Sequence, residues 1–136
     1  MKIIYLIASI FLLFCNSAFP CSCYFPDEHI EESDAAAAYV FIARPAGKNG
    51  FLSFSNNRFK FKEITFLKGK PNEKVKVWSE KMFFGCGQFF SEKKEYVVFA
   101  YIENEKLYTS RCSSWVASEY PKSTEIVVNY YKRKEQ

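Results

Sequence analysis

The sequence predicts a mainly β domain, a small sandwich or barrel, with a short helix at its start and a second helix at its end. Two patterns predict this class: five segments read as strands, and helical spacing of apolar residues occurs only near the two ends of the mature chain. A third observation is covalent. Four cysteines follow an apolar leader, an even number that suits a disulfide framework in an exported protein.

Residues 1–20 have the features of a signal peptide. Lys2 supplies the basic start, and Ile3–Phe14 is an apolar stretch shorter than the roughly 20 residues of a bilayer-spanning helix. Small residues follow it, so we expect cleavage within 17–20, although Pro20 is unusual beside a cleavage site. We therefore expect a secreted or periplasmic protein with no membrane segment after cleavage.

The remaining residues, 21–136, are expected to form one domain that buries roughly two-thirds of its unfolded surface. The formal charge of the whole chain is +4, too small an excess to indicate an acidic partner. The sequence holds no Gly-rich phosphate loop, no Gly-x-Ser-x-Gly elbow and a single histidine, His29. We therefore expect a protein that is not an enzyme and holds no cofactor.

The first elements are a short helix and a strand. Pro26–Asp34 suits a helix because proline fits a first turn and the acidic residues that follow complement the positive end of the dipole. Ala38–Ala43 reads as a strand that Pro45 and Gly47 stop.

A second strand, Arg58–Leu67, alternates basic and apolar residues at its start. Alternation places Phe59 and Phe61 inward and leaves the cations in water. A basic, aromatic segment on a barrel also fits an oligonucleotide site, but inward phenylalanines and export argue against one. We expect no nucleic acid partner, and we expect Lys68–Asn72 to form a turn.

Three further strands and a helix complete the domain. The strands are expected around Val75–Trp78, at Glu95–Tyr101 and at Lys106–Arg111. Beyond Pro121, apolar residues recur at helical spacing, and three cations complement the negative end of the helix dipole: Ile126, Val127, Tyr130 and Tyr131, then Lys132, Arg133 and Lys134.

The acidic residues of the early helix lie around His29: Glu28, Glu31, Glu32 and Asp34. They lack the alternating ligands and central glycine of a calcium loop. We expect a solvated helix face with a solvated histidine.

The cysteines of the mature chain are Cys21, Cys23, Cys86 and Cys112, which allow three pairings. A bond between Cys21 and Cys23 would be strained, whereas either arrangement with two long loops suits disulfide geometry. A four-thiolate zinc site is the alternative, but the paired Cys-x-x-Cys spacing is absent and an oxidising compartment favours disulfides.

Several motifs together resemble a known family. They are a Cys-x-Cys after the signal peptide, a short helix before an Ala-rich strand, Gly85-Cys86-Gly87, Tyr96–Ala100 and the segment Thr109–Ser113. This order resembles the netrin-like domain and, more closely, the inhibitory N-terminal domain of tissue inhibitors of metalloproteinases (TIMPs), in particular its short single-domain bacterial relatives. The resemblance implies a five-stranded OB-type barrel with flanking helices and the pairs Cys21–Cys86 and Cys23–Cys112.

The resemblance also implies a mechanism. The α-amine and carbonyl oxygen of Cys21, if it is the first residue, would bind the catalytic zinc of a metalloendopeptidase and displace the attacking water. Ser22 would point toward the specificity pocket of the protease. The implied protease contacts continue along the same edge, with 82–87 alongside: Cys21, Ser22, Cys23, Tyr24, Phe84, Gly85 and Gly87.

The chain departs from the animal pattern, because it lacks the extra cysteine pair that ties the early helix to the end of the domain, and Ala18-Phe19-Pro20 blurs the cleavage site. A netrin-like binding module without inhibition is the alternative function. It would dock another extracytoplasmic protein through Phe83, Phe84, Phe89 and Phe90, which equally suit a core.

Overall fold

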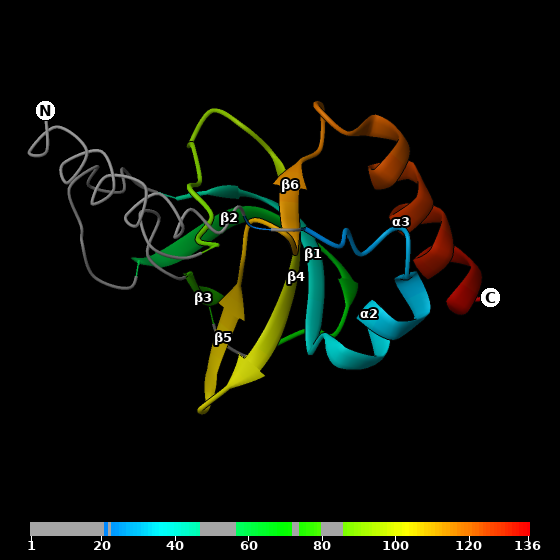
Figure 1. Cartoon of the computed structure of the whole chain (residues 1–136), viewed down its shortest axis with the longest axis horizontal. Coiled ribbons are helices and arrows are strands. Elements are labelled where there is room, and N and C mark those ends of the chain that lie inside the picture. Colours follow the sequence, from blue (N-terminus) through cyan, green and yellow to red (C-terminus); the bar gives the residue numbers. More distant parts are fainter. Residues whose placement is uncertain (1–20, 22, 47–56, 72–73, 80–85) are drawn as a thin grey trace, which may run out of the picture.

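The computed structural model describes residues 21, 23–46, 57–71, 74–79 and 86–136. Two helices and six strands occur in this part of the chain (Figure 1). In chain order they are α2 (Ile30–Ala36), β1 (Tyr39–Pro45), β2 (Asn57–Lys68), β3 (Lys76–Ser79), β4 (Tyr96–Glu103), β5 (Lys106–Thr109), β6 (Ser114–Val116) and α3 (Pro121–Lys134).

Five of the strands close into a barrel in the order β1-β2-β3-β5-β4, and β1 pairs with β4 to complete it. The β3–β5 pair is parallel and the others are antiparallel. The mainly β, five-stranded barrel with flanking helices is therefore confirmed. The sixth strand, β6, pairs with the start of β4 and was not predicted, because three residues are too few to show alternation.

Two apolar layers hold the molecule together. The first fills the barrel and includes Phe41, Phe59, Phe90 and Val98. The second lies between the barrel wall and the helices and includes Phe99, Trp115, Val127 and Tyr131. Because β4 contributes to both layers, all five residues of Tyr96–Ala100 are buried, which explains their continuous apolar run.

The alternation predicted for β2 is confirmed: Phe59 and Phe61 are buried, while Arg58, Lys60 and Lys62 are exposed. The bounds of other elements differ from the expectation.

The early helix begins at Ile30 and ends at Ala36, whereas Pro26–His29 forms turns. One of these turns is closed by the amide of Glu28, which donates to the carbonyl of Phe25 at 3.1 Å. Pro45 is the last residue of β1 rather than its stop, since a strand end does not need the missing amide.

The expectation of a solvated acidic face is wrong for Asp34. This residue of α2 is 5 % exposed and contacts side chains of α3. Figure 1 shows the two helices side by side. The Asp34 carboxylate accepts hydrogen bonds from Tyr131 Oη at 2.9 Å, Tyr130 Oη at 3.2 Å and Lys134 Nζ at 2.5 Å, and Lys68 Nζ lies 3.4 Å away. Lys134 therefore interacts with Asp34 as well as with the helix dipole. Lys68, expected in a turn, is the last residue of β2 and forms an ion pair with the same carboxylate.

Asp34 joins the early helix to the end of the domain. Burial opposes ionisation of the carboxyl, but the hydrogen bonds from Lys134, Tyr131 and Tyr130 and the charge of Lys68 outweigh it, so the pKa of Asp34 falls to about 2. Burial, together with the carboxylate, raises the pKa of Tyr131, which keeps its hydroxyl as a donor.

We expect Asp34→Asn to lower the free energy of unfolding at pH 7 by about 2 kcal/mol, since one pKa unit corresponds to about 1.4 kcal/mol. The depressed pKa stabilises the fold above pH 4, and this contribution is lost as the pH falls from about 4 to about 2. Urea unfolding at several pH values measures both effects. Glu32→Gln, on the exposed side of α2, is the control, and an equal loss in the two variants would contradict the role of Asp34.

Candidate functional site at the N-terminal edge

Two disulfides fix the start of the domain to the barrel. Cys21 is bonded to Cys86, 65 residues away, and Cys23 is bonded to Cys112, 89 residues away. This is the pairing that the family resemblance implies. The four-thiolate zinc alternative is wrong because the four sulfurs form two disulfide bonds and are not free thiolates. Two disulfides also indicate folding in an oxidising, extracytoplasmic environment.

The two segments that hold the N-terminus are themselves joined. The carbonyl oxygen of Cys86 accepts a hydrogen bond from the amide of Arg111 at 2.8 Å, beside Cys112. Two residues after Cys86, the amide of Gln88 donates to Ser79 Oγ at 2.7 Å, and Ser79 is fully buried at the end of β3. Both disulfides are therefore attached to ordered parts of the barrel.

A cluster of hydroxyl groups shapes the turn that carries Cys112. Ser113 Oγ accepts a hydrogen bond from the amide of Ser110 at 2.8 Å and shares one with Thr109 Oγ1 at 3.1 Å. Ser110 Oγ accepts from the amide of Cys112 at 3.2 Å, and Ser114 Oγ donates to the carbonyl of Ser110 at 2.7 Å. Short hydroxyl side chains satisfy the backbone of a tight turn, so this segment holds the cysteine in place.

Of the two residues after Cys23, Phe25 packs against the domain and Tyr24 is exposed. Phe25 packs edge-on against Trp115, with ring centroids 6.4 Å apart, and lies 5.9 Å from the ring of Tyr120. Tyr24 is 68 % exposed and stacks on His29, with centroids 4.0 Å apart. His29 is thus half-buried against a tyrosine rather than fully solvated as expected.

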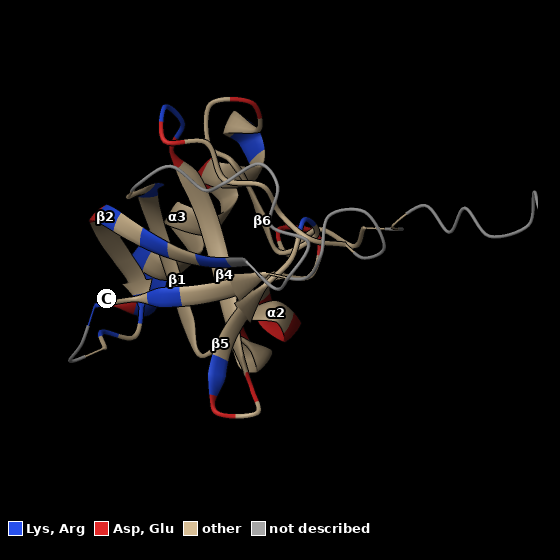
Figure 2. Cartoon of the chain, turned by 90° about the vertical axis from the view of Figure 1, so that its left-hand side faces the viewer, with Lys and Arg blue, Asp and Glu red and all other residues tan. Residues whose placement is uncertain are grey.

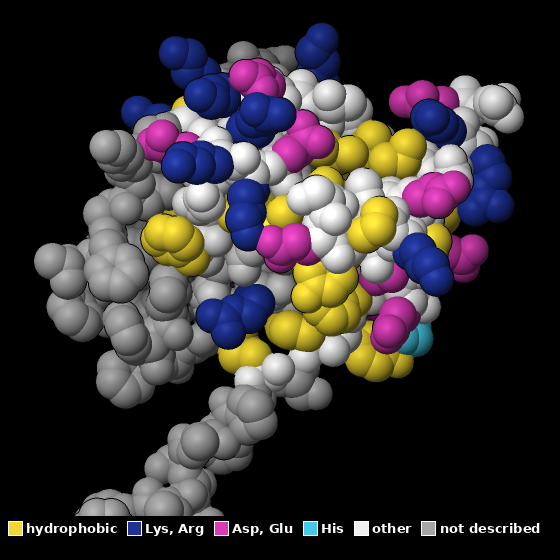
Figure 3. Space-filling view, turned by 90° about the horizontal axis from the view of Figure 1, so that it is seen from above, with side chains coloured by type: hydrophobic (Ala, Val, Ile, Leu, Met, Phe, Trp, Pro, Cys, Tyr) yellow, Lys and Arg dark blue, Asp and Glu magenta, His cyan; other side chains and the backbone are white. Residues whose placement is uncertain are grey.

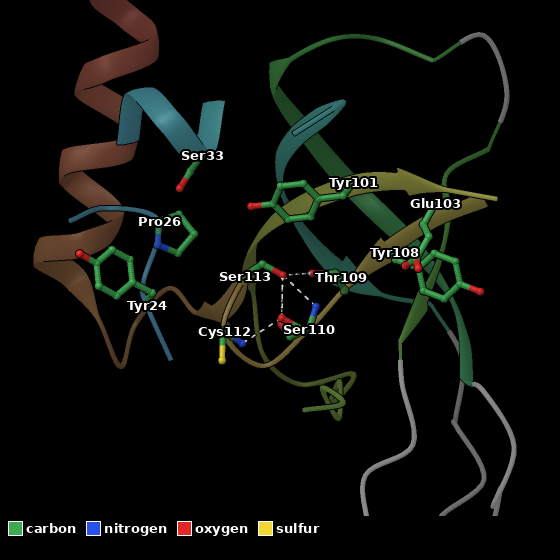
Figure 4. A pocket seen from close by; sticks show the side chains of 10 residues that line it. All are labelled: Tyr24, Pro26, Ser33, Tyr101, Glu103, Tyr108, Thr109, Ser110, Cys112 and Ser113. Carbon is green, nitrogen blue, oxygen red and sulfur yellow. Dashed lines mark hydrogen bonds between the residues drawn. The ribbon is translucent and has the colours of Figure 1, made fainter. Parts of the chain in front are cut away.

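A hollow of about 400 Å³ lies beside the disulfide of Cys112 (Figure 4). Tyr24 and Pro26 form one end, Tyr108 and Glu103 lie at the other, and Tyr101 extends across it. The hydroxyl cluster lines it between these ends. Burial raises the pKa of Tyr101, so its phenol stays neutral and offers a hydrogen-bond donor there.

The structure places several of the predicted contact residues on one edge. Cys21, Cys23 and Tyr24 lie in sequence along it, and Gly87 follows the Cys86 bridge but is buried. Ser22, Phe84, Gly85 and the alternative contact Phe83 lie outside the described residues. The two remaining phenylalanines divide: Phe89 is 41 % exposed, whereas Phe90 is 1 % exposed in the barrel core.

Sequence reasoning missed the residues that line the hollow opposite Tyr24. Tyr101 and Tyr108 were assigned to strands, and nothing in one strand shows that they are cross-strand partners. The run of hydroxyl residues around Cys112 was the available signal, since Ser and Thr cluster where a turn must satisfy its own backbone.

Within the described ranges, no group of three His, Cys, Asp or Glu side chains is placed to bind a metal ion. The candidate site therefore offers main-chain groups, hydroxyls and aromatic rings for contact with a partner. No helix in the same ranges combines the length and hydropathy needed to cross a membrane.

Comparison with known proteins adds no assignment: no protein-family model matches this chain, and no curated protein matches it in sequence. The case for a function therefore rests on the residues and geometry of the chain itself.

Proposed function

We propose that this chain is a secreted or periplasmic, TIMP-like inhibitor of zinc metalloendopeptidases. In this proposal the mature chain begins at Cys21, whose α-amine and carbonyl oxygen bind the catalytic zinc of the target. One observation carries the proposal. Cys21 and Cys23, two residues apart, are each bonded by a disulfide to a different segment of the barrel.

Anchoring of the N-terminus matters because it lowers the entropy that the inhibitor loses on binding. A flexible N-terminus would lose conformational entropy on entering an active site, at about 1–2 kcal/mol for each ordered residue. Two disulfides restrict that freedom before binding, so less free energy is lost on association. Phe25 adds to this, because its contacts with Trp115 and Tyr120 hold the chain directly after the cysteines.

The chemistry of the target completes the argument. A catalytic zinc keeps one coordination position for water, and an amine with a neighbouring carbonyl oxygen occupies that position as a chelate. The α-amine loses its proton readily near neutral pH, so metal binding is accessible to it. Tyr24, exposed and stacked on His29, then extends the contact surface beyond the zinc ligand.

Titration of the mature chain against a panel of zinc endopeptidases tests the proposal. We expect stoichiometric loss of activity in at least one enzyme, with competition from a small hydroxamate that binds the same zinc. A serine endopeptidase, which has no zinc, is the control and should keep its full rate. Binding to zinc enzymes without any change in their rates would contradict inhibition.

That contrary result would favour the second candidate, a module that docks an extracytoplasmic protein without inhibiting it. Exposed aromatic residues support this candidate, since Tyr24, Phe89 and Tyr120 are all more than 40 % exposed. Figure 3 shows hydrophobic side chains reaching the surface among charged ones on the face seen from above. Aromatic residues at a surface are typical of protein contact sites.

A further inference from the structure

The outer wall of the barrel on β2, β3, β5 and β4 carries one row of aromatic residues. Arg58 on β2 pairs with Trp78 on β3, Trp78 pairs with Tyr108 on β5, and Tyr108 pairs with Tyr101 on β4. Paired residues of neighbouring strands point to the same side of a sheet. The row therefore runs from a cation through three aromatic rings, and Tyr101 and Tyr108 end it in the hollow shown in Figure 4.

A row of cations lies two residues along the same strands, so it is on the same face. Lys60 on β2 pairs with Lys76 on β3. Lys76 and Lys106 directly precede Val77 and Leu107, which pair with each other, so Lys106 on β5 continues the row. Strands are about 4.8 Å apart, so the three lysines extend over roughly 10 Å. Figure 2 shows basic residues recurring along β2 and at one end of β5.

Two cations of this face contact the Trp78 ring, and one acid, Glu103 on β4, lies across from Lys106. Lys106 Nζ lies 4.7 Å from the centroid of the Trp78 ring, and Arg58 Cζ lies 5.8 Å from it. None of Arg58, Lys60, Lys76 and Lys106 belongs to an ion pair with another described residue. Glu103 forms no ion pair with Lys106, and a cation–π contact orients a cation without neutralising it, so four cations against one acid leave the face with a local positive potential.

A second hollow, of about 410 Å³, adjoins Trp78, Lys76 and Lys106. Its described lining also includes Ile102 and the acidic Glu105 of the β4–β5 hairpin and shares no residue with the hollow beside Tyr101. The helices do not cover this part of the wall: the layer under α2 and α3 includes Tyr101 at its margin but not Trp78 or Tyr108. Within the described residues, the face is therefore elongated, aromatic and basic, and no helix covers it.

We propose that this face, defined as Arg58, Lys60, Lys76, Trp78, Lys106 and Tyr108, binds a linear acidic polysaccharide. Carboxylate or sulfate groups spaced along a chain match a row of cations that form no ion pair with a described residue, and the aromatic row beside them packs against sugar rings. A compact anion would reach only one or two of these cations. The face shares Tyr108 with the hollow of the N-terminal edge, but its four cations do not line that hollow, and binding does not depend on protease inhibition.

A single-stranded nucleic acid is the other linear polyanion. The aromatic row could stack on bases as well as on sugar rings, so the rings do not separate the two ligands. The disulfides indicate an extracytoplasmic environment, where acidic polysaccharides are common polyanions. This environment favours the polysaccharide.

Tryptophan fluorescence of the mature chain tests the proposal directly. The chain has two tryptophans, and Trp115 is only 3 % exposed, so a change on titration reports on Trp78. We expect dextran sulfate and polygalacturonate to change the emission at low salt and neutral dextran to leave it unchanged. The change should disappear in Trp78→Phe, which keeps Trp115.

Two triple variants of equal charge decide whether this face is the site. Lys60→Gln, Lys76→Gln and Lys106→Gln together should weaken binding by at least about tenfold, measured by calorimetry. The control replaces three exposed cations of α3 with Gln, Lys122, Lys132 and Arg133, and should weaken binding by less than about twofold. Circular dichroism verifies that both variants fold.

Three results would overturn the proposal. The first is an equal loss of affinity in the two triple variants, which would mean that total charge alone drives binding. The second is binding of neutral dextran as tight as that of the acidic chains. The third is tighter binding of a thymidine oligonucleotide, or of phosphatidylglycerol vesicles, than of either acidic polysaccharide, which would assign the face to another class of partner.

Discussion

A mature chain that carries one extra alanine before Cys21 is expected to lose inhibition of its target zinc endopeptidase. The extra residue converts the α-amine of Cys21 into an amide, which is a poor zinc ligand. Losing a metal ligand removes several kcal/mol, so the inhibition constant should rise by about a hundredfold or more. Steady-state inhibition kinetics on the two chains measures this effect.

The fold provides the control for this variant. Because the added residue lies outside the disulfides and the barrel, thermal unfolding of the extended chain should match that of the parent within about 0.5 kcal/mol. Acidic polysaccharide binding should also be unchanged, since the cationic face lies elsewhere. An extended chain that still inhibits with the same constant would contradict zinc chelation by Cys21.

The second large effect is on stability, and it comes from the disulfides. Replacing Cys23 and Cys112 with Ala is expected to lower the free energy of unfolding by about 3.5 kcal/mol, and the melting temperature by roughly 10–20 °C. The loss is smaller than a loop of 89 residues suggests, because the bond between Cys21 and Cys86 still closes most of that loop.

With that first bond in place, the second bond closes a ring of roughly 28 residues, which is the length to use in the chain-entropy estimate. The ring is the same whichever bond is formed first, since it consists of the chain from Cys86 to Cys112 and from Cys21 to Cys23. Replacing either pair should therefore cost about the same.

Replacing both pairs should cost about 8 kcal/mol, enough to unfold many domains of this size. Denaturant unfolding of the three variants gives these differences. Single-pair variants that differ by more than about 2 kcal/mol would contradict a shared ring.

The strands could be predicted where neighbouring residues carry the signal. The alternation of β2 fixed Phe59 and Phe61 inside the barrel, because a period of two depends only on local sequence. The apolar run Tyr96–Ala100 likewise indicated a strand, although not that both of its faces are covered.

Residues whose environment depends on distant partners could not be predicted in this way. Asp34 looked like one more solvated acid of an early helix, but its partners Tyr131 and Lys134 are about one hundred residues away in the chain. The row of Trp78, Tyr108 and Tyr101 could not be predicted for the same reason. It forms only because β3 pairs in parallel with β5 and because β4 and β5 form a hairpin.

The identity of the first residue of the exported chain is the most direct test of the proposed function. Mass spectrometry of the intact protein, recovered after export, measures it. We expect a mature chain that begins with Cys21 and has a free α-amine, despite Pro20 at the cleavage site. A mature chain that begins with Ala18 or Phe19 would contradict zinc chelation, while leaving the barrel and its disulfides as described.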